Sequence, residues 1–430
     1  MKMPVEIRMR KLSFGKTFLV KIIKLSKYYL ISLSDFSKDL YKDGVKRTIL
    51  PAKIILQSIC CWPDSDTAFA LFVGWLLFAN LFLILIFHAA YVFKHFNDIG
   101  DTIAVGVTVT TTIEALARLY LIITRRRIIN STLVMVWKQF WPVNALETKA
   151  TQRIERSAQT VVILATMLLI LASSCNCFLS GVPLVRYHDI IFKSAFPFDW
   201  EMMYVYEFIY VWQYFISWFE VLLVCGFDFF FTTLVSICAL QFTIMQEIFK
   251  SILTRKSKKQ RMAIFGERGR KMTDREMLFE CLEQHKLLIG ICNDLEKSFN
   301  TQILLQFFVS TCAICAPSLV LKIDSSQFFK TMTYAVGHLC QLYNYCHVGA
   351  TLSHESVLLS QAIYESNWHL THDIQFQKAL LIMLQRSQNA QCLTAVGVTE
   401  MNFESFIKIL RLSFSFYTLL NNLLMKNMNV

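Results

Sequence analysis

Charged residues are scarce in this sequence of 430 residues. Asp, Glu, Lys and Arg together make up 17% of the chain, whereas hydrophobic residues make up 55%. Soluble domains carry about 25% charged residues. A chain so poor in charge and so rich in apolar side chains is typical of a membrane protein, and we expect an all-α membrane fold.

Motifs that carry catalysis are also missing. The sequence contains no nucleophile elbow, no phosphate-binding loop and no metal-ligand cluster. The histidines are scattered, and Cys312 and Cys315 lie in an apolar segment without the second pair that would strengthen a zinc signal. We therefore predict that the chain is not an enzyme and that it needs no cofactor and no metal ion.

Cysteines are absent from the loops predicted to lie outside the cell, although the chain has thirteen of them. Most G-protein-coupled receptors tie their third span to an outer loop with a disulfide, which this chain cannot form with its own cysteines. Pro317 is the only proline in the interior of a predicted span, so the proline-kinked helices usual in those receptors are missing too. Both absences count against a G-protein-coupled receptor, the main alternative from another class.

Seven long apolar segments follow one another along the chain. A membrane-spanning helix needs about 20 mostly apolar residues. The predicted spans are Thr67–Phe93, Ile99–Thr124, Ala158–Pro183, Met203–Ile248, Phe299–Ile323, Phe328–Tyr364 and Phe403–Met425. The fourth and sixth are longer than a bilayer requires, so we expect both to project past the inner leaflet.

Basic residues gather on one side of these segments. Lys and Arg crowd the stretch 1–67, the surroundings of Arg125–Arg127 and the stretch from Lys250 to Arg275, whereas the alternate loops hold few. Cytoplasmic loops carry the excess of Lys and Arg, so we predict a cytoplasmic amino terminus and an extracellular carboxyl terminus. The net charge of +12 is assigned to contact with anionic inner-leaflet lipid and not to nucleic acid.

The predicted spans divide the chain into six regions. They are a cytoplasmic amino-terminal region with short membrane-surface helices (1–66), spans one to four (67–248), a cytoplasmic basic loop and helix (249–298), spans five and six with a cytoplasmic extension (299–364), a cytoplasmic anchor helix and loop (365–401), and the last span with an extracellular tail (402–430). Short helices are predicted at Tyr28–Leu33 and Ile54–Cys60. The basic run Arg255–Lys271 is predicted to be a flexible loop or a frayed helix end.

The carboxyl-terminal part of the chain contains an ordered series of short motifs. In order they are Tyr345–Gly349, Ser353–Ser356, Ala362–Trp368, Leu384–Gln388, Phe403–Phe406 and Ser413–Leu420. Each motif is weak alone, but the ordered set resembles the carboxyl-terminal region of insect odorant receptors. Gustatory-type receptor channels of the same superfamily are the alternative. They resemble the chain less, because their Thr-Tyr and Gln-Phe pairs are Ser415-Phe416 and Asn422-Leu423 here.

The resemblance implies a function and a set of partners. Members of this family form tetrameric, odorant-gated, non-selective cation channels, in which the last helix of each subunit lines one pore. Most are tuning subunits that assemble with a shared co-receptor, Orco, which has a larger loop between spans four and five than this chain has. The resemblance therefore implies a hetero-tetramer in the plasma membrane, in the dendrites of olfactory sensory neurons. It would bind a small volatile or pheromone-like odorant, contact membrane lipid, pass cations and require no G protein.

The last span is the predicted pore helix. One face at helical spacing carries Leu412, Phe416, Leu419 and Leu423, with Asn422 beside them. Four such helices would make apolar rings, and apolar constrictions gate by dewetting. The amide would hydrate cations without selecting among them. The alternative is a packed last helix whose asparagines face water.

The outer halves of four spans supply the predicted ligand site, because an odorant site should be apolar with a few polar groups. The candidates are Val105, Thr108, Val109, Thr112, Ala172, Cys175, Asn176, Leu179, Tyr204, Phe208, Val211, Tyr214, Tyr334, Ala335 and His338. Asn176 and His338 are predicted to orient an oxygenated ligand. Glu114 and Arg118 are predicted to form an internal ion pair, since charges within a membrane tend to pair.

An amphipathic segment at Ile374–Ala390 is too short and too polar to span a membrane, and it is predicted to be a cytoplasmic helix. The resemblance implies that the segment's apolar residues Leu380 and Leu384, with Leu358 at the inner end of span six, contact neighbouring subunits. Apolar surface in water costs about 25 cal/mol per Å², so this face needs a cover. Folding within the chain is the alternative cover.

Overall fold

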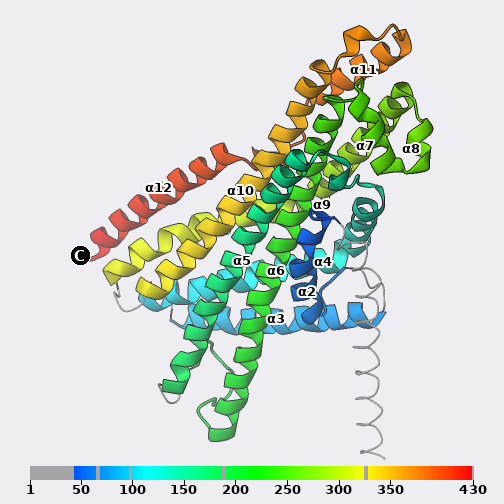
Figure 1. The fold of residues 1–430 in the computed structure, drawn as a ribbon. Coiled ribbons are helices and arrows are strands. Elements are labelled where there is room, and N and C mark those ends of the chain that lie inside the picture. Colours follow the sequence, from blue (N-terminus) through cyan, green and yellow to red (C-terminus); the bar gives the residue numbers. More distant parts are fainter. Residues whose placement is uncertain (1–42, 64–67, 96–98, 186–189, 324–327, 429–430) are drawn as a thin grey trace, which may run out of the picture. The chain divides into compact units, whose positions relative to one another are not determined.

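The computed structural model describes residues 43–63, 68–95, 99–185, 190–323 and 328–428 of the chain. The fold divides into two units, Met1–Arg47 and Thr48–Val430. The description of the first unit begins at residue 43, so the predicted helix at Tyr28–Leu33 lies outside the described residues. The second unit is helical over most of its length (Figure 1).

Seven long helices make up most of the second unit. They are α3 (Ala68–Lys94), α4 (Ile99–Gln139), α5 (Thr148–Val185), α6 (Met203–Phe249), α9 (Asp274–Ile323), α10 (Phe328–Tyr364) and α12 (Phe403–Met428). Each corresponds to one predicted span, so the predicted all-α, seven-helix membrane fold is confirmed.

Shorter elements precede or connect the long helices. They are η1 (Lys46–Ile49), α2 (Leu50–Ser58), η2 (Val143–Ala145), α7 (Arg255–Phe265), α8 (Glu267–Lys271), η4 (Trp368–Leu370), α11 (Ile374–Ser387), β1 (Thr394–Ala395) and β2 (Thr399–Glu400). The two strands pair antiparallel, with Thr394 opposite Glu400. The helices α2 and α11 overlap the segments predicted as short helices at Ile54–Cys60 and Ile374–Ala390.

Three of the long helices extend beyond their predicted spans. The helix α4 continues past Thr124 to Gln139, α5 begins at Thr148 and not at Ala158, and α9 begins at Asp274 and not at Phe299. The added segments carry many charged and amide side chains. A search for spans finds only the apolar part of a helix, so it misses the polar turns that continue the same helix.

The basic run 255–271, predicted as a flexible loop or a frayed helix end, forms the helices α7 and α8. Gly266 separates them with a φ of +61°, a left-handed conformation that glycine adopts readily. Lys256 of α7 lies 2.7 Å from the Glu147 carboxyl, and this ammonium holds the pKa of Glu147 below its usual range. Lys256, in the basic run, therefore pairs with a carboxyl group that lies far from it in the sequence.

The helix α6 contacts α2, α4, α5, α9 and α10. From Leu223 to Phe249 its side chains are buried almost without interruption. Phe227, Phe229 and Phe231 in this stretch are each at most 2% exposed. This part of α6 is the centre of the apolar core.

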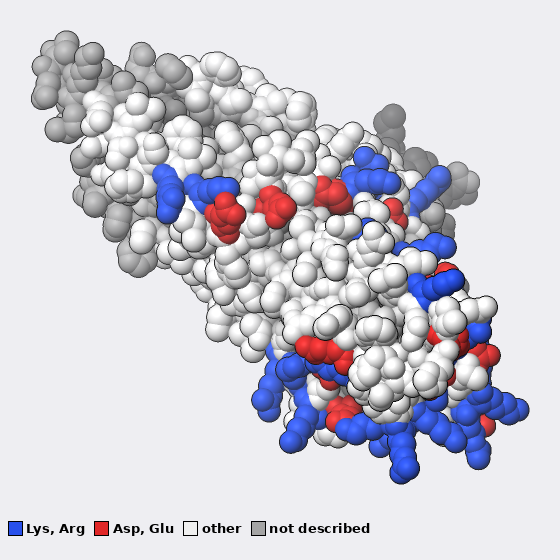
Figure 2. Space-filling view, turned by 90° about the horizontal axis from the view of Figure 1, so that it is seen from above, with Lys and Arg blue, Asp and Glu red and all other residues white. Residues whose placement is uncertain are grey.

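Other long helices expose their apolar side chains. The exposed residues of α3 include Phe69, Phe72, Trp75, Leu76, Phe82, Leu83, Ile86 and Phe93. A contiguous apolar surface of this kind marks contact with a membrane or another protein. In Figure 2, Lys and Arg crowd one end of the visible face, while much of the remaining surface is uncharged. Lipid around the uncharged part and water at the charged end account for both distributions.

Five of the long helices are apolar over a length that can cross a membrane. Within the described ranges, these are α3, α4, α5, α6 and α9. The described part of α10 is more polar. In α10, polar residues such as Gln341 and Asn344 lower the apolarity, yet both are buried against neighbouring helices.

The helix α10 approaches the β1–β2 hairpin at Gly349. A Cβ atom at this position would lie 2.1 Å from the carbonyl oxygen of Met401, so only glycine fits without displacement. Met401 donates a backbone hydrogen bond to the Leu393 carbonyl at 2.8 Å, and α12 begins shortly afterwards at Phe403. The backbone of α10 therefore lies directly against the segment that leads into α12.

Candidate ligand-binding site

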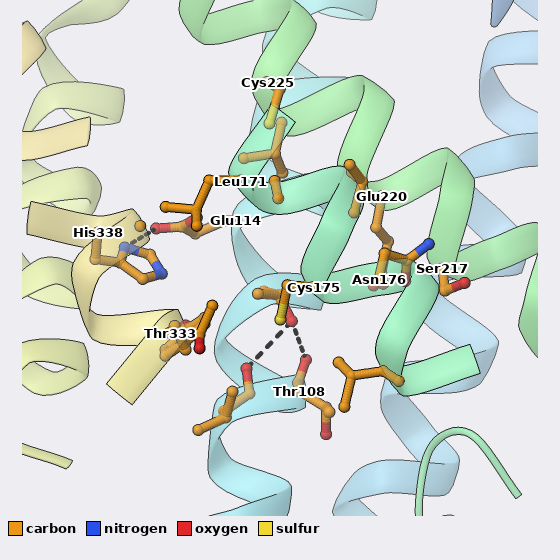
Figure 3. A pocket seen from close by; sticks show the side chains of 18 of the residues that line it. Thr108, Glu114, Leu171, Cys175, Asn176, Ser217, Glu220, Cys225, Thr333 and His338 are labelled. Carbon is orange, nitrogen blue, oxygen red and sulfur yellow. Dashed lines mark hydrogen bonds and ion pairs between the residues drawn. The ribbon is translucent and has the colours of Figure 1, made fainter. Parts of the chain in front are cut away.

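A cavity of about 160 Å³ lies between α4, α5, α6 and α10 (Figure 3). Its surface is mostly apolar, with a small polar share. The described lining residues are Val107, Thr108, Thr111, Glu114, Leu168, Leu171, Ala172, Cys175, Asn176, Leu179, Phe192, Ser217, Glu220, Val221, Val224, Cys225, Thr333, Tyr334, Gly337, His338 and Gln341. An apolar space with a few polar groups between helices is the usual form of a small-molecule site.

Part of the predicted ligand site surrounds this cavity. The predicted residues that line it are Thr108, Ala172, Cys175, Asn176, Leu179, Tyr334 and His338. They come from α4, α5 and α10, which are distant in the sequence and meet here. Asn176 and His338, predicted to orient a ligand, are at most 5% exposed.

The other predicted residues lie away from the cavity lining. They are Val105, Val109, Thr112, Tyr204, Phe208, Val211, Tyr214 and Ala335. Tyr204 and Phe208 are 86% and 73% exposed, so this part of α6 faces outward. The cavity instead takes residues further along the helix, from Ser217 to Cys225. Helical spacing shows which residues share a face, but it does not show the direction in which that face points.

Glu220 is the lining residue that the sequence interpretation missed most clearly. Its side chain enters the cavity from α6, and the residue is 6% exposed. The Thr112 hydroxyl donates a hydrogen bond to Glu220 Oε1 at 2.8 Å, so Thr112 positions the carboxyl group without lining the cavity. The available signal was an ionisable residue within a long apolar segment, which marks a functional position by default.

A buried polar network centred on Arg118 lies beside the cavity. The Arg118 guanidinium is 3.2 Å from Glu114 and 3.0 Å from Asp228. The predicted Glu114–Arg118 pair is therefore confirmed, and Asp228 is a second carboxylate partner contributed by α6. Asp228 also accepts hydrogen bonds from Gln341 at 2.5 Å and from the Tyr345 hydroxyl at 2.7 Å. Because Gln341 lines the cavity, the network extends to the cavity wall.

Several polar atoms of the lining have no hydrogen-bond partner among the described residues. They are Nδ2 of Asn176, Nδ1 of His338 and both carboxyl oxygens of Glu114. His338 Nδ1 lies 3.9 Å from Glu114 Oε1, the contact marked in Figure 3, which is too long for a hydrogen bond. Buried polar groups are ordinarily hydrogen-bonded. Glu114 Oε2 lies 3.2 Å from Arg118, so Asn176 and His338 are the residues of this set that the described chain leaves without a close polar partner.

The predicted pore residues lie on α12, which contacts α9 and α10. Leu412, Phe416 and Leu419 are 48%, 43% and 56% exposed, and Asn422 is also exposed. Leu423 lies within α12, but its side chain is outside those that the structure describes. The described helices of the chain thus leave the predicted pore face largely uncovered.

The predicted subunit-contact residues are covered by the chain itself. Leu380 is 4% exposed, and Leu358 and Leu384 are half-buried, because α11 packs against α9 and α10. The large apolar side chains that α11 leaves open are Ile374, Leu381 and Ile382, which are 63% to 67% exposed. Leu380 therefore has little free surface in the single chain, and the open apolar residues lie on another face of α11.

The fold is that of a seven-helix membrane protein with a mostly apolar cavity between its helices. The family described as 7tm Odorant receptor matches residues 98–414 of the chain. The chain belongs to this family. Family membership supports the prediction that the chain is not an enzyme.

Individual relatives match shorter stretches. Odorant receptor 22c of Drosophila melanogaster is 28% identical over 152 residues, which cover 35% of this chain and 37% of that relative. Odorant receptor Or2 of Anopheles gambiae is 30% identical over 146 residues, which cover 33% of this chain and 38% of that relative. The chain thus matches less than half the length of these curated relatives.

A solved structure matches nearly the whole fold. The insect olfactory receptor OR5 from Machilis hrabei superposes with a TM-score of 0.74 at 13% sequence identity, and the match covers 87% of this chain and 97% of that one. The same receptor in complex with eugenol matches with a TM-score of 0.74 at 14% identity, covering 88% and 98%. At this identity the likeness establishes the fold.

Proposed function

We propose that the chain is an odorant-tuned subunit of a ligand-gated, non-selective cation channel. The observation that carries this proposal is the cavity of about 160 Å³ between α4, α5, α6 and α10. Its mostly apolar surface suits a small volatile molecule, and its few polar groups provide orientation. The complex of the related fold with eugenol supports the same class of ligand.

In this proposal, α12 from each of four subunits lines the pore. The exposed face with Phe416 and Leu419 supports this role, because apolar rings close a pore by dewetting. Asn422 would supply amides that hydrate passing cations. A ligand opens such a pore only by binding the open state more tightly than the closed state.

The helix α10 provides a physical connection between the cavity and the pore helix. His338 and Gln341 of α10 line the cavity, and Gly349 of the same helix lies against Met401, just before α12. A shift of α10 on ligand binding would therefore move the start of α12. This connection supports gating of the pore from the cavity.

The proposed partner is the shared co-receptor, in a hetero-tetramer. The open apolar residues Leu381 and Ile382 of α11 support contact with other subunits in the cytoplasm. We further propose a cytoplasmic amino terminus, an extracellular carboxyl terminus, and a location in the plasma membrane of olfactory neuron dendrites. The concentration of Lys and Arg at one end (Figure 2) supports this orientation, and no G protein is required.

Measurement of cation current tests the proposal. Cells expressing the chain with the co-receptor, the chain alone, or the co-receptor alone would be exposed to the same panel of volatile compounds. We expect current in response to some compounds only when both subunits are present. An absence of ligand-evoked current at normal surface expression contradicts the proposal, and a G-protein response without current favours a G-protein-coupled receptor.

A further inference from the structure

The cavity combines an apolar wall with an excess of acidic groups. Glu114 and Glu220 both line it, and they are 1% and 6% exposed. The described lining contains no Lys and no Arg. Carboxyl groups within a membrane are costly unless they are paired, so the partners of these two residues decide what the cavity binds.

Arg118 is the cation nearest to the acidic groups, and its guanidinium is already engaged. Its Nε and Nη2 donate hydrogen bonds to the two Asp228 oxygens at 3.0 and 3.3 Å, and Nη2 also donates to Gln306 at 2.6 Å. The remaining Nη1 lies 3.2 Å from Glu114 Oε2 but makes no hydrogen bond among the described residues. One guanidinium therefore serves two carboxyl groups, and Glu220 is a third that has no ion pair with it.

The two lining carboxyl groups differ in how open they are to a ligand. Both oxygens of Glu114 are buried and accept no hydrogen bond within the described part of the chain, and Oε2 lies 3.2 Å from Arg118 Nη1. For Glu220, the hydrogen bond from Thr112 reaches Oε1. An ionised carboxyl group has about four lone-pair sites, so Glu220 can accept a hydrogen bond from a ligand.

The cavity volume limits the size of that ligand. A cavity of about 150 Å³ lined by apolar side chains holds benzene in another protein, and the cavity here is about 160 Å³. The ligand therefore has an apolar part about as large as one ring or one branched five-carbon chain.

We propose, on the basis of the function proposed above, that the cavity is selective for small amines. The ligand's ammonium group donates a hydrogen bond to Glu220, with the Glu114 carboxyl as the second acidic group of the lining, and its hydrocarbon part lies against Leu168, Leu171 and Leu179. An alkylamine resembles the lysine side chain, whose pKa is about 10.4, so it carries a positive charge at neutral pH. That charge offsets the acidic excess of the lining, which an alcohol or an ester cannot do.

The test compares matched ligands on cells that express the chain with its co-receptor. The probes are 3-methylbutylamine and 3-methylbutan-1-ol, which share one hydrocarbon skeleton, within a broader panel of neutral esters and ketones. We expect the amine to activate current at a concentration about 10-fold to 100-fold below that of the alcohol, the ratio that corresponds to one charge-assisted hydrogen bond.

Variants then assign the preference to the acidic residues. Glu220→Gln keeps the shape and the acceptor for Thr112 but removes the charge, so we expect the ratio of the half-activating concentrations of alcohol and amine, measured in the same variant, to fall to about one. Ser236→Ala is the control, because Ser236 is buried in α6 outside the described cavity lining. If Glu220→Gln fails to reach the cell surface, Glu114→Gln and the ligand comparison on the unmodified chain decide the question.

The outcomes separate this inference from the proposed function. Current evoked by neutral compounds but not by the amine overturns the amine preference and leaves the odorant-gated channel standing. An amine preference that survives both glutamine substitutions also overturns the assignment. An absence of current with every compound, at normal surface expression of both subunits, overturns the proposed function and the amine preference together.

Discussion

The two parts of α6 differ in how tightly they are packed. From Leu223 onward almost every side chain is buried, whereas Tyr204 and Phe208, near the start of the helix, are largely exposed. The cavity lies along the helix between these extremes, from Ser217 to Cys225. We therefore expect substitutions in the closely packed part of α6 to lower stability and substitutions in the cavity lining to change ligand preference.

The largest expected effect follows from removal of the buried cation. Arg118→Ala leaves the Asp228 and Glu114 carboxyl groups buried without a positive partner, and such a loss costs about 3–5 kcal/mol. We expect a strongly reduced melting temperature and loss of surface expression. The control is Arg153→Ala, because Arg153 pairs with Glu247 while 62% exposed, and exposed pairs contribute about 1 kcal/mol or less. An equal fall in melting temperature and surface expression in the two variants would contradict the expectation that the buried ion pair contributes more to stability than the exposed one.

Truncation of aromatic residues compares the two parts of α6 directly. Phe242→Ala opens a cavity in the closely packed part, where the residue is 0% exposed, and should cost about 3 kcal/mol or more. Phe208→Ala removes a ring that is 73% exposed and should change stability by about 0.5 kcal/mol or less. Thermal unfolding of the detergent-solubilised protein measures both. A similar fall in melting temperature for the two variants would show that burial in the single chain does not predict how much each ring contributes to stability.

Charge on the open face of α11 should disrupt assembly without unfolding the chain. We expect the double substitution Leu381→Asp and Ile382→Asp to reduce co-purification with the co-receptor several-fold, because both side chains are more than 60% exposed in the chain alone. The matched variant is Leu380→Asp. It buries a charge at a position that is 4% exposed and should lower the stability of the chain itself. Normal co-purification of the Leu381/Ile382 variant places the subunit contact elsewhere.

Smaller changes are expected at the polar groups of the cavity. Asn176→Ala and His338→Ala each remove a group that can hold a ligand, so we expect a change of about fivefold to tenfold in the half-activating ligand concentration. Assembly with the co-receptor should be unchanged. Phe208→Ala is the control for an exposed position on α6, and a change as large in that variant would argue against an effect specific to the cavity.

The smallest expected change is in the current measured without ligand. Leu419→Ala shortens an apolar side chain on the proposed pore face, which should lower the dewetting barrier and raise basal current about twofold or more. Phe414→Ala is the comparison, since Phe414 is 67% exposed on a different face of α12. Unchanged basal current in Leu419→Ala, at normal surface expression, removes this residue from the gate.

The long helices could be predicted from the sequence, because a long apolar segment is recognised from residues that follow one another along the chain. The sequence also predicted the Glu114–Arg118 pair, whose members are one helical turn apart. Asp228 could not be found in the same way, because it meets Arg118 across 110 positions of sequence. The helices α7 and α8 were missed for a related reason, since Glu147, the carboxylate that pairs with Lys256 of α7, lies in a distant segment.

The ligand site shows a second limit of sequence interpretation. Asn176 and His338 were correctly placed on helices that meet, and both line the cavity. Tyr204 and Phe208 have the composition expected of a pocket, yet they point outward. In a membrane, lipid and a ligand cavity both favour apolar and aromatic side chains, so composition does not distinguish the two surfaces. A buried acidic residue such as Glu220 does distinguish them, because lipid cannot pair with it.

At Gly349 two backbone segments touch with no side chain between them. Side chains between two helices can change rotamer and absorb a small displacement, but at Gly349 the backbone of α10 lies directly against the backbone of Met401. A displacement of α10 there is passed to the segment before α12 with little loss. His338 lies about three turns away on the same helix, where side chains can vary with the ligand. In the proposed gating, a residue of the cavity lining such as His338 can vary with the ligand, whereas position 349 is limited to glycine by its contact with Met401.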